Sequence, residues 1–150
     1  CLTSGSTVVA TKFLRNIEME LKQMPMNYLH NWNNMDTKEF NKLIAPFFWI
    51  EHNNNFSVSL NAGDYKQEIF AKREEDGFEG NGYDWCSLAY VFLKEYEPQL
   101  RNYINHDPEA GMYCAYSDNP EALKRFVINF KKACENDSII YDLLSRAEID

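Results

Sequence analysis

Four carboxylates that lie near glycines are the side chains of this chain best suited to chemistry. Glu79 and Asp84 lie in one glycine-containing stretch, and Asp107 and Glu109 lie in a second one. Two carboxylates held close together can act as general acid and base, or bind a hard cation through their oxygens. No motif fixes the mutual geometry of these four, so a hydrolytic or small-ligand-binding domain remains an alternative function.

The sequence contains no motif of the common nucleophilic, zinc or dithiol catalytic centres. Gly-x-Ser-x-Gly, His-Glu-x-x-His and Cys-x-x-Cys are all absent. The histidines His30, His52 and His106 are scattered, without a Cys or Ser at a recognised spacing, and we expect surface or turn positions for them. We therefore predict that the chain is not an enzyme and uses neither a cofactor nor a metal.

The first glycine-containing stretch, residues 77–85, reads Gly-Phe-Glu-Gly-Asn-Gly-Tyr-Asp-Trp. Glycine permits backbone angles that a side chain forbids, so the stretch can form a demanding turn. It lacks the Lys and Ser/Thr of a phosphate-binding P-loop, and its carboxylates would repel phosphate. We expect a loop that directs a helix starting at Trp85, with Asp84 as the N-cap.

Helices are predicted where apolar residues recur at a spacing of three and four. The pattern is clearest from Trp85 to Tyr96, and it continues beyond a bend at Pro98. A capping-box pattern, Asp36 to Glu39, predicts another start. The expected helices cover residues 12–24, 36–44, 85–104, 119–134 and 139–144.

Strands are predicted where apolar and polar residues alternate. Residues 47–52 and 56–60 flank an Asn-rich turn and indicate an antiparallel hairpin. Residues 65–73 favour a third strand, with a helix as the alternative, and residues 112–116 a fourth. No strand–helix–strand rhythm repeats, so we predict an α+β fold: an antiparallel sheet of about four strands with helices packed on one face.

Composition limits the partners. A chain of 150 residues with 45% hydrophobic and 15% aromatic residues can bury one sizeable core. The net charge of -8 and the isoelectric point of about 4.9 disfavour nucleic acid as a partner and suit a basic protein. No apolar run reaches the roughly 20 residues that a membrane-spanning helix needs.

The cysteines bear on the compartment. We expect Cys86, Cys114 and Cys134 to be small buried or half-buried thiols, with a Cys114–Cys134 disulfide left open. A reduced, cytoplasmic setting fits them best. Cys1 precedes Leu-Thr-Ser-Gly-Ser, which is either a lipid-modified terminus with a polar tether or the point where the sequence was cut. The alternative is therefore a periplasmic or lipid-anchored interaction protein.

Residues 41–150 resemble the immunity protein 51 family of bacterial polymorphic toxin systems. The resemblance rests on Pro46-Phe47, on Glu79-Gly80-Asn81-Gly82-Tyr83-Asp84-Trp85, on Asp107-Pro108-Glu109-Ala110-Gly111-Met112-Tyr113-Cys114-Ala115-Tyr116-Ser117, and on the helix 123–130. Members of such families are small non-enzymatic proteins encoded beside a toxin, which they bind and neutralise. The resemblance divides the chain into an N-terminal tether and helical extension, residues 1–40, and an immunity-protein-like α+β domain, residues 41–150.

The implied function is to cover the active surface of a cognate toxin domain. A basic nuclease is one candidate for this toxin. Acidic loops would attract such a partner, and exposed aromatic residues such as Tyr83, Tyr90 and Tyr113 would anchor it. We expect the partner to contact Glu74, Glu75, Asp76, Glu79, Asn81, Tyr83, Asp107 and Glu109. A structural role in the motifs falls to Gly80, Gly82, Asp84, Trp85, Pro108 and Gly111.

Overall fold

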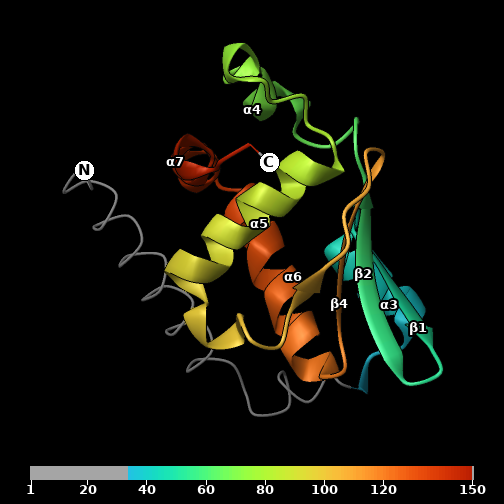
Figure 1. Ribbon diagram of the computed structural model, residues 1–150. Helices are drawn as coiled ribbons and strands as arrows, with labels where there is room; N and C mark the ends of the chain where they lie inside the picture. The colour runs from blue at the N-terminus through green and yellow to red at the C-terminus, as the bar shows by residue number, and fades with distance from the viewer. Residues whose placement is uncertain (1–33, 150) are drawn as a thin grey trace.

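The computed structural model describes residues 34–149 (Figure 1). The expected helix 12–24, His30 and the interpretation of Cys1 lie outside these residues. The elements are α3 (Thr37–Ile44), β1 (Phe48–His52), β2 (Asn55–Asn61), α4 (Gln67–Ala71), η1 (Glu74–Asp76), α5 (Gly82–Tyr96), η2 (Pro98–Leu100), β3 (Asn105–His106), β4 (Met112–Ser117), α6 (Pro120–Cys134) and α7 (Asp137–Arg146).

The four strands form one antiparallel sheet in the order β1-β2-β4-β3. The expected hairpin is confirmed, because β1 and β2 pair from Phe48↔Ser59 to His52↔Asn55. Asn53 and Asn54 turn the chain with φ angles of 49° and 63°, which asparagine tolerates better than most residues. The later strand β4 then pairs with β2, so the hairpin is joined to a segment much further along the chain.

Helices cover one face of this sheet (Figure 1). Trp49, Val58 and Ala115 lie opposite one another on β1, β2 and β4, and their exposed fractions are 3%, 0% and 0%. The next row carries Ile50 and Tyr116, which are 44% and 46% exposed. Because neighbouring residues of a strand point to opposite faces, only the first row faces the helices. The predicted α+β fold is confirmed.

Trp85, near the start of α5, is the centre of an aromatic cluster. Its side chain is fully buried, and its ring lies 5.7 Å from Tyr65, 5.2 Å from Phe70, 6.1 Å from Phe130 and 6.2 Å from Phe47. These rings come from four separate parts of the chain. Large buried aromatic side chains contribute most to core stability, so Trp85 fixes where α5 begins relative to the rest of the core.

The strand expected over residues 65–73 is wrong, and this segment contains helix α4 instead. Lys66 has a left-handed backbone with φ of 55°, which ends any extended run before the helix. Ile69 and Phe70 are consecutive and are both 1% exposed. A strand would have pointed one of them to each face, whereas a helix buries both against the same core.

The helix expected to continue through residue 104 is also wrong. α5 ends at Tyr96, and Glu97 leaves the helical region with φ of -136°. Pro98 then starts only the short turn η2. Asn105 and His106 form β3 instead, paired with β4, so the sheet has four strands although residues 65–73 supply none of them.

The cysteines are thiols within the core or beside it. Cys86 and Cys134 are buried, Cys114 is half-buried, and no disulfide joins Cys114 to Cys134. Burial raises the pKa of the Cys134 thiol well above its usual range. Among residues 34–149, no helix combines the length and the apolar character that crossing a membrane requires.

Candidate functional site

The loop before α5 is held by Asp84. The helix begins at Gly82 with Asn81 as its N-cap, so the expectation that Asp84 would be the cap is wrong. The Asp84 carboxylate instead accepts hydrogen bonds from the backbone N–H groups of Glu79 (2.7 Å), Gly80 (2.7 Å) and Asn81 (3.3 Å). Asn81 Oδ1 in turn accepts from the Asp84 N–H at 2.9 Å, which completes a capping box.

The two glycine-containing stretches pack directly against each other at Gly82. Its N–H donates to the carbonyl of Ala110 at 3.1 Å. A Cβ at Gly82 would collide with the backbone carbonyl oxygens of Glu109 and Met112, so only glycine fits this approach. Gly80 has a φ of 77° and lies against the side chain of Gln67. At Gly111, by contrast, an added Cβ would meet nothing.

The predicted partner-binding residues fall into two groups. Glu79, Asn81 and Tyr83 line one depression of about 380 Å³ together with Gly77 and Ile149. The three residues of η1, which are acidic and exposed, directly precede this depression along the chain. Together with Glu79 we call them the acidic corner. The acidic corner consists of Glu74, Glu75, Asp76 and Glu79.

The second group is the turn between β3 and β4. Asp107 and Glu109 have exposed side chains there, and Pro108 between them is half-buried. The backbone N–H of Glu109 donates to the carbonyl of Met112 at 2.7 Å and so closes the turn. The backbone of this turn packs against Gly82 at the start of α5. The structure therefore brings the main chains of the two groups of predicted residues into contact.

The four carboxylates considered for catalysis do not form an isolated acid–base pair. Glu79 and Asp84 line the same depression, yet the Asp84 carboxylate is already occupied by three backbone donors. Asp107 and Glu109 are exposed. Within residues 34–149, no three His, Cys, Asp or Glu side chains gather closely enough to hold a metal ion.

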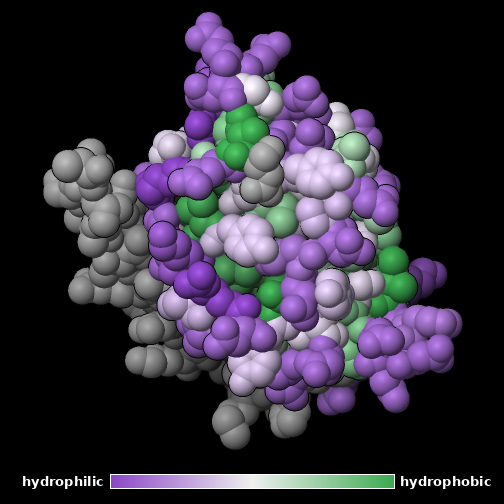
Figure 2. Space-filling model, in the orientation of Figure 1, coloured by the Kyte–Doolittle hydropathy of each residue, from purple (hydrophilic) through white to green (hydrophobic). Residues whose placement is uncertain are grey.

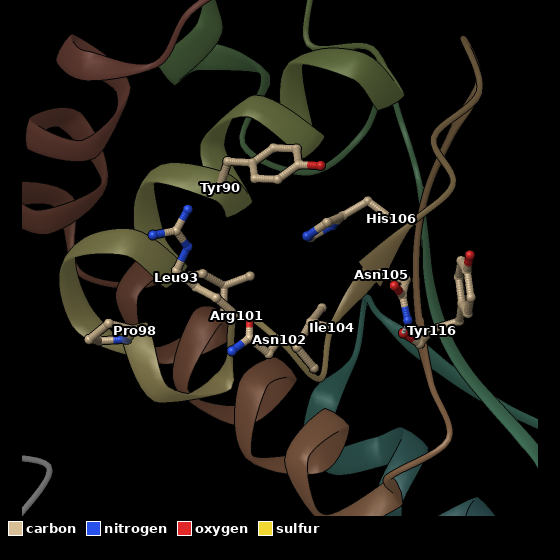
Figure 3. A pocket seen from close by; sticks show the side chains of 9 residues that line it. All are labelled: Tyr90, Leu93, Pro98, Arg101, Asn102, Ile104, Asn105, His106 and Tyr116. Carbon is tan, nitrogen blue, oxygen red and sulfur yellow. Dashed lines mark hydrogen bonds between the residues drawn. The ribbon is translucent and has the colours of Figure 1, made fainter.

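A larger pocket lies at the other end of α5 (Figure 3). Its volume is about 620 Å³, and its walls come from α5, from the segment that follows α5, and from strands β3 and β4. We call it the Arg101 pocket. It is lined by Tyr90, Leu93, Pro98, Arg101, Asn102, Ile104, Asn105, His106 and Tyr116.

His106 forms the inner wall of the Arg101 pocket. Its Nδ1 lies 2.9 Å from the hydroxyl of Tyr113, and its ring lies 4.6 Å from the ring of Tyr90. Burial lowers the pKa of His106 to about 4, so the imidazole is neutral at pH 7. The expectation that His106 would be a surface or turn residue is wrong, and so is exposure of Tyr113, which is fully buried.

Arg101 differs from the other arginines of the described chain. Arg73, Arg125 and Arg146 each lie within 3.3 Å of a carboxylate oxygen. The side chain of Arg101 is exposed, and between residues 34 and 149 it makes no ion pair. An arginine without a carboxylate partner keeps the full hydrogen-bonding capacity of its guanidinium group.

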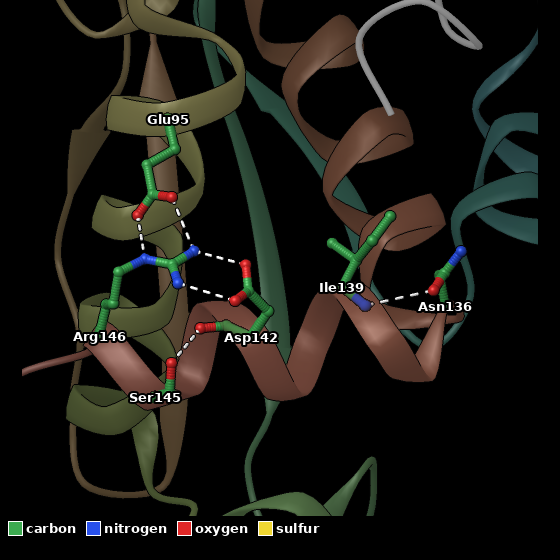
Figure 4. Close-up of polar contacts among 6 residues, drawn as sticks. All are labelled: Glu95, Asn136, Ile139, Asp142, Ser145 and Arg146. Carbon is green, nitrogen blue, oxygen red and sulfur yellow. Dashed lines mark hydrogen bonds and ion pairs between the residues drawn. The ribbon is translucent and has the colours of Figure 1, made fainter. Parts of the chain in front are cut away.

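Arg146 shows what a fully engaged arginine looks like in this protein (Figure 4). Its guanidinium group donates to both carboxylate oxygens of Glu95 at 2.7 Å, and to those of Asp142 at 2.9 and 2.6 Å. These two carboxylates raise the pKa of Arg146 further above its usual range. The arrangement ties α7 to α5, so Arg146 has a structural role.

Sequence reasoning missed most of the Arg101 pocket. Tyr90 was expected to be exposed, and it is 54% exposed. Arg101 and His106 belong to no motif, Tyr116 lies in the second family motif, and the three meet only because β3 pairs with β4. The one local signal was Pro98, which ends α5 and lets the chain turn back toward the sheet.

Comparison with known proteins agrees with the motifs. Residues 47–149 match the family described as immunity protein 51. The matched range includes the loop before α5, the turn between β3 and β4, and all residues that line the Arg101 pocket. No curated protein and no solved structure matches the chain significantly.

Proposed function

The chain belongs to the immunity protein 51 family, and from this membership we propose that it binds a cognate bacterial toxin domain and covers the toxin's active surface. Neutralisation by binding requires a rigid surface and no catalytic group of its own. The aromatic cluster around Trp85 and the capping box of α5 provide such rigidity.

The acidic corner supports this proposal most directly. Its four acidic residues are exposed, and Glu79 lines the same depression as Tyr83, which is 44% exposed. In a protein of net charge -8, such a surface attracts a basic partner and raises the rate of association. Exposed tyrosines supply large contact area at a low cost in side-chain entropy. We propose that a basic toxin surface, for example that of a nuclease, lies over this corner.

The test is neutralisation of the toxin domain encoded beside this gene. Cells that express the toxin domain alone should stop growing, and co-expression of this chain should restore growth. Purified toxin domain and chain should form a complex whose affinity falls as salt increases, because exposed charges are screened. Failure of both rescue and complex formation would refute the proposed function. Affinity that does not change with salt would refute only the electrostatic part.

A further inference from the structure

We propose that the Arg101 pocket is a carboxylate-binding site that receives an acidic side chain of the toxin partner. This inference rests on the proposed function and names a contact that neither the family match nor the motifs assign.

The pocket has the dimensions of a binding site. Its volume of about 620 Å³ falls in the range of roughly 300–1,000 Å³ that is usual for sites of drug-sized ligands. It can therefore admit a side chain together with part of the loop that carries it. In Figure 3 the imidazole nitrogen of His106 points into the space bounded by Tyr90 and Arg101.

Arg101 selects the charge of the occupant. A guanidinium group presents a planar fork of donors that matches the two oxygens of a carboxylate. The other three arginines of the described chain already use this fork on internal carboxylates, and Arg101 does not. His106 is neutral at pH 7, so the positive charge on the pocket wall comes from Arg101.

The rim of the pocket has the composition of an interface anchor. Tyr90 is 54% exposed and forms the wall that α5 provides, whereas the ring of Tyr116, which is 46% exposed, lies on the sheet face that points away from the helices (Figure 3). Tyrosine and arginine are among the residues most enriched at positions that dominate binding energy in protein complexes. An acidic side chain bound to Arg101 would therefore lie beside the ring of Tyr90, which partly excludes water.

Charge changes sign along the exposed side of α5. Tyr83, Tyr90 and Lys94 are exposed and lie on one face of the helix together with the buried Ser87, because the four follow one another at intervals of three and four residues. The acidic corner adjoins the beginning of this row, and Arg101 lines hollows shared with Tyr90 and Lys94 at its end. Figure 2 shows this side of the molecule as pale residues of intermediate hydropathy among purple polar ones, with smaller green apolar areas between them.

A partner that lies along this row has only one favourable orientation. Its basic surface must face the acidic corner, and one acidic side chain must reach Arg101. Reversing the partner would place like charges together at both ends, which is costly at an interface. The Arg101 pocket thus sets the direction of docking.

The first experiment tests the pocket without the toxin. Isotope-labelled protein is titrated with benzoate, and with benzamide as a neutral compound of the same shape. We expect benzoate alone to shift the NMR signals of the residues lining the pocket. Arg101→Ala should abolish these shifts, and Lys38→Ala, which removes an exposed charge from α3, should leave them unchanged. Shifts that persist in Arg101→Ala, or none in the wild type, would overturn the proposal.

The second experiment identifies the source of the carboxylate. Arg101→Ala should weaken binding of the neighbouring toxin domain at least tenfold, mainly through faster dissociation, and Lys38→Ala should not. Arg101→Glu should be rescued when one acidic residue of the toxin is changed to Lys. If Arg101→Ala binds the toxin as Lys38→Ala does, the partner is not the occupant, even where benzoate binds. Absence of toxin binding by the wild type would instead refute the proposed function, and with it this occupant.

Discussion

The two ends of α5 carry polar groups in opposite states. At the start, the Asp84 carboxylate accepts three backbone hydrogen bonds, and Arg73 is held by Asp76 and by the carbonyls of Leu144 and Ala147. At the end, Arg101 makes no ion pair among residues 34–149. A group whose hydrogen bonds are made within the protein stabilises the fold, whereas an exposed group without an internal ion pair can exchange its water for a partner. Motif membership alone therefore does not identify an interface residue.

The largest expected effect is on stability, at the start of α5. Trp85→Ala should lower the free energy of unfolding by about 3–5 kcal/mol, because it empties the centre of the aromatic cluster. Tyr83→Ala, two residues earlier and 44% exposed, is the control and should have little effect on stability. Chemical denaturation measures both. Equal losses of unfolding free energy in the two variants would contradict the assignment of Trp85 to the core and of Tyr83 to the surface.

Asp84→Ala should cost less, about 1–3 kcal/mol, because it leaves three backbone N–H groups without their acceptor. The neighbouring carboxylate Glu79 has an exposed side chain, so Glu79→Ala serves as the control. Hydrogen exchange should show faster opening of the loop 79–81 in Asp84→Ala alone. If the two variants lose the same stability, Asp84 is not the residue that holds this loop.

The two ends should also affect different rate constants of toxin binding. Glu75→Lys in the acidic corner should lower the association rate constant roughly two- to fivefold, since exposed charges act mainly by steering. Its effect should shrink as salt rises. Glu39→Lys, which changes an exposed charge on α3, should leave association nearly unchanged. Stopped-flow kinetics can separate this slower association from the faster dissociation expected for Arg101→Ala. If Glu75→Lys mainly changed the dissociation rate constant, the acidic corner would not act by steering.

The last expected effect concerns pH and the end of α5, and it is absent at neutral pH. Burial lowers the pKa of His106 to about 4, against 6.5 in the unfolded chain. Above pH 6.5 neither state binds the proton, and between pH 6.5 and 4 the unfolded state binds it and the folded state does not. At about 1.4 kcal/mol for each unit of pKa difference, this group should therefore reduce the free energy of unfolding by up to about 3 kcal/mol as the pH falls through that window.

His106→Gln provides the comparison for this pH effect, because glutamine does not titrate. The difference in unfolding free energy between wild type and His106→Gln should change with pH between 6.5 and 4 and be constant above 6.5. Denaturation at several pH values measures it. A constant difference over the whole range would show that His106 is not buried as a neutral ring.

Much of the fold could be predicted from local patterns. The hairpin β1–β2 follows from alternating residues around a turn of asparagines. The start of α3 follows from Asp36, whose carboxylate accepts from the N–H of Glu39 at 2.8 Å. Asn119 and Pro120 likewise start α6. Each of these signals acts between residues that are close in sequence, so no knowledge of the distant chain is needed.

The sequence by itself determined the long helices, the hairpin, the acidic charge and the family, because periodicity, capping and motif order are properties of neighbouring residues. Only the tertiary structure decided that residues 67–71 are helical, that Asn105 and His106 form a strand, and that Gly82 lies against Glu109. It also brought Arg101, His106 and Tyr116 to one pocket. Short segments have weak local preferences, so contacts between distant parts of the chain decide their conformation and which side chains stay unpaired.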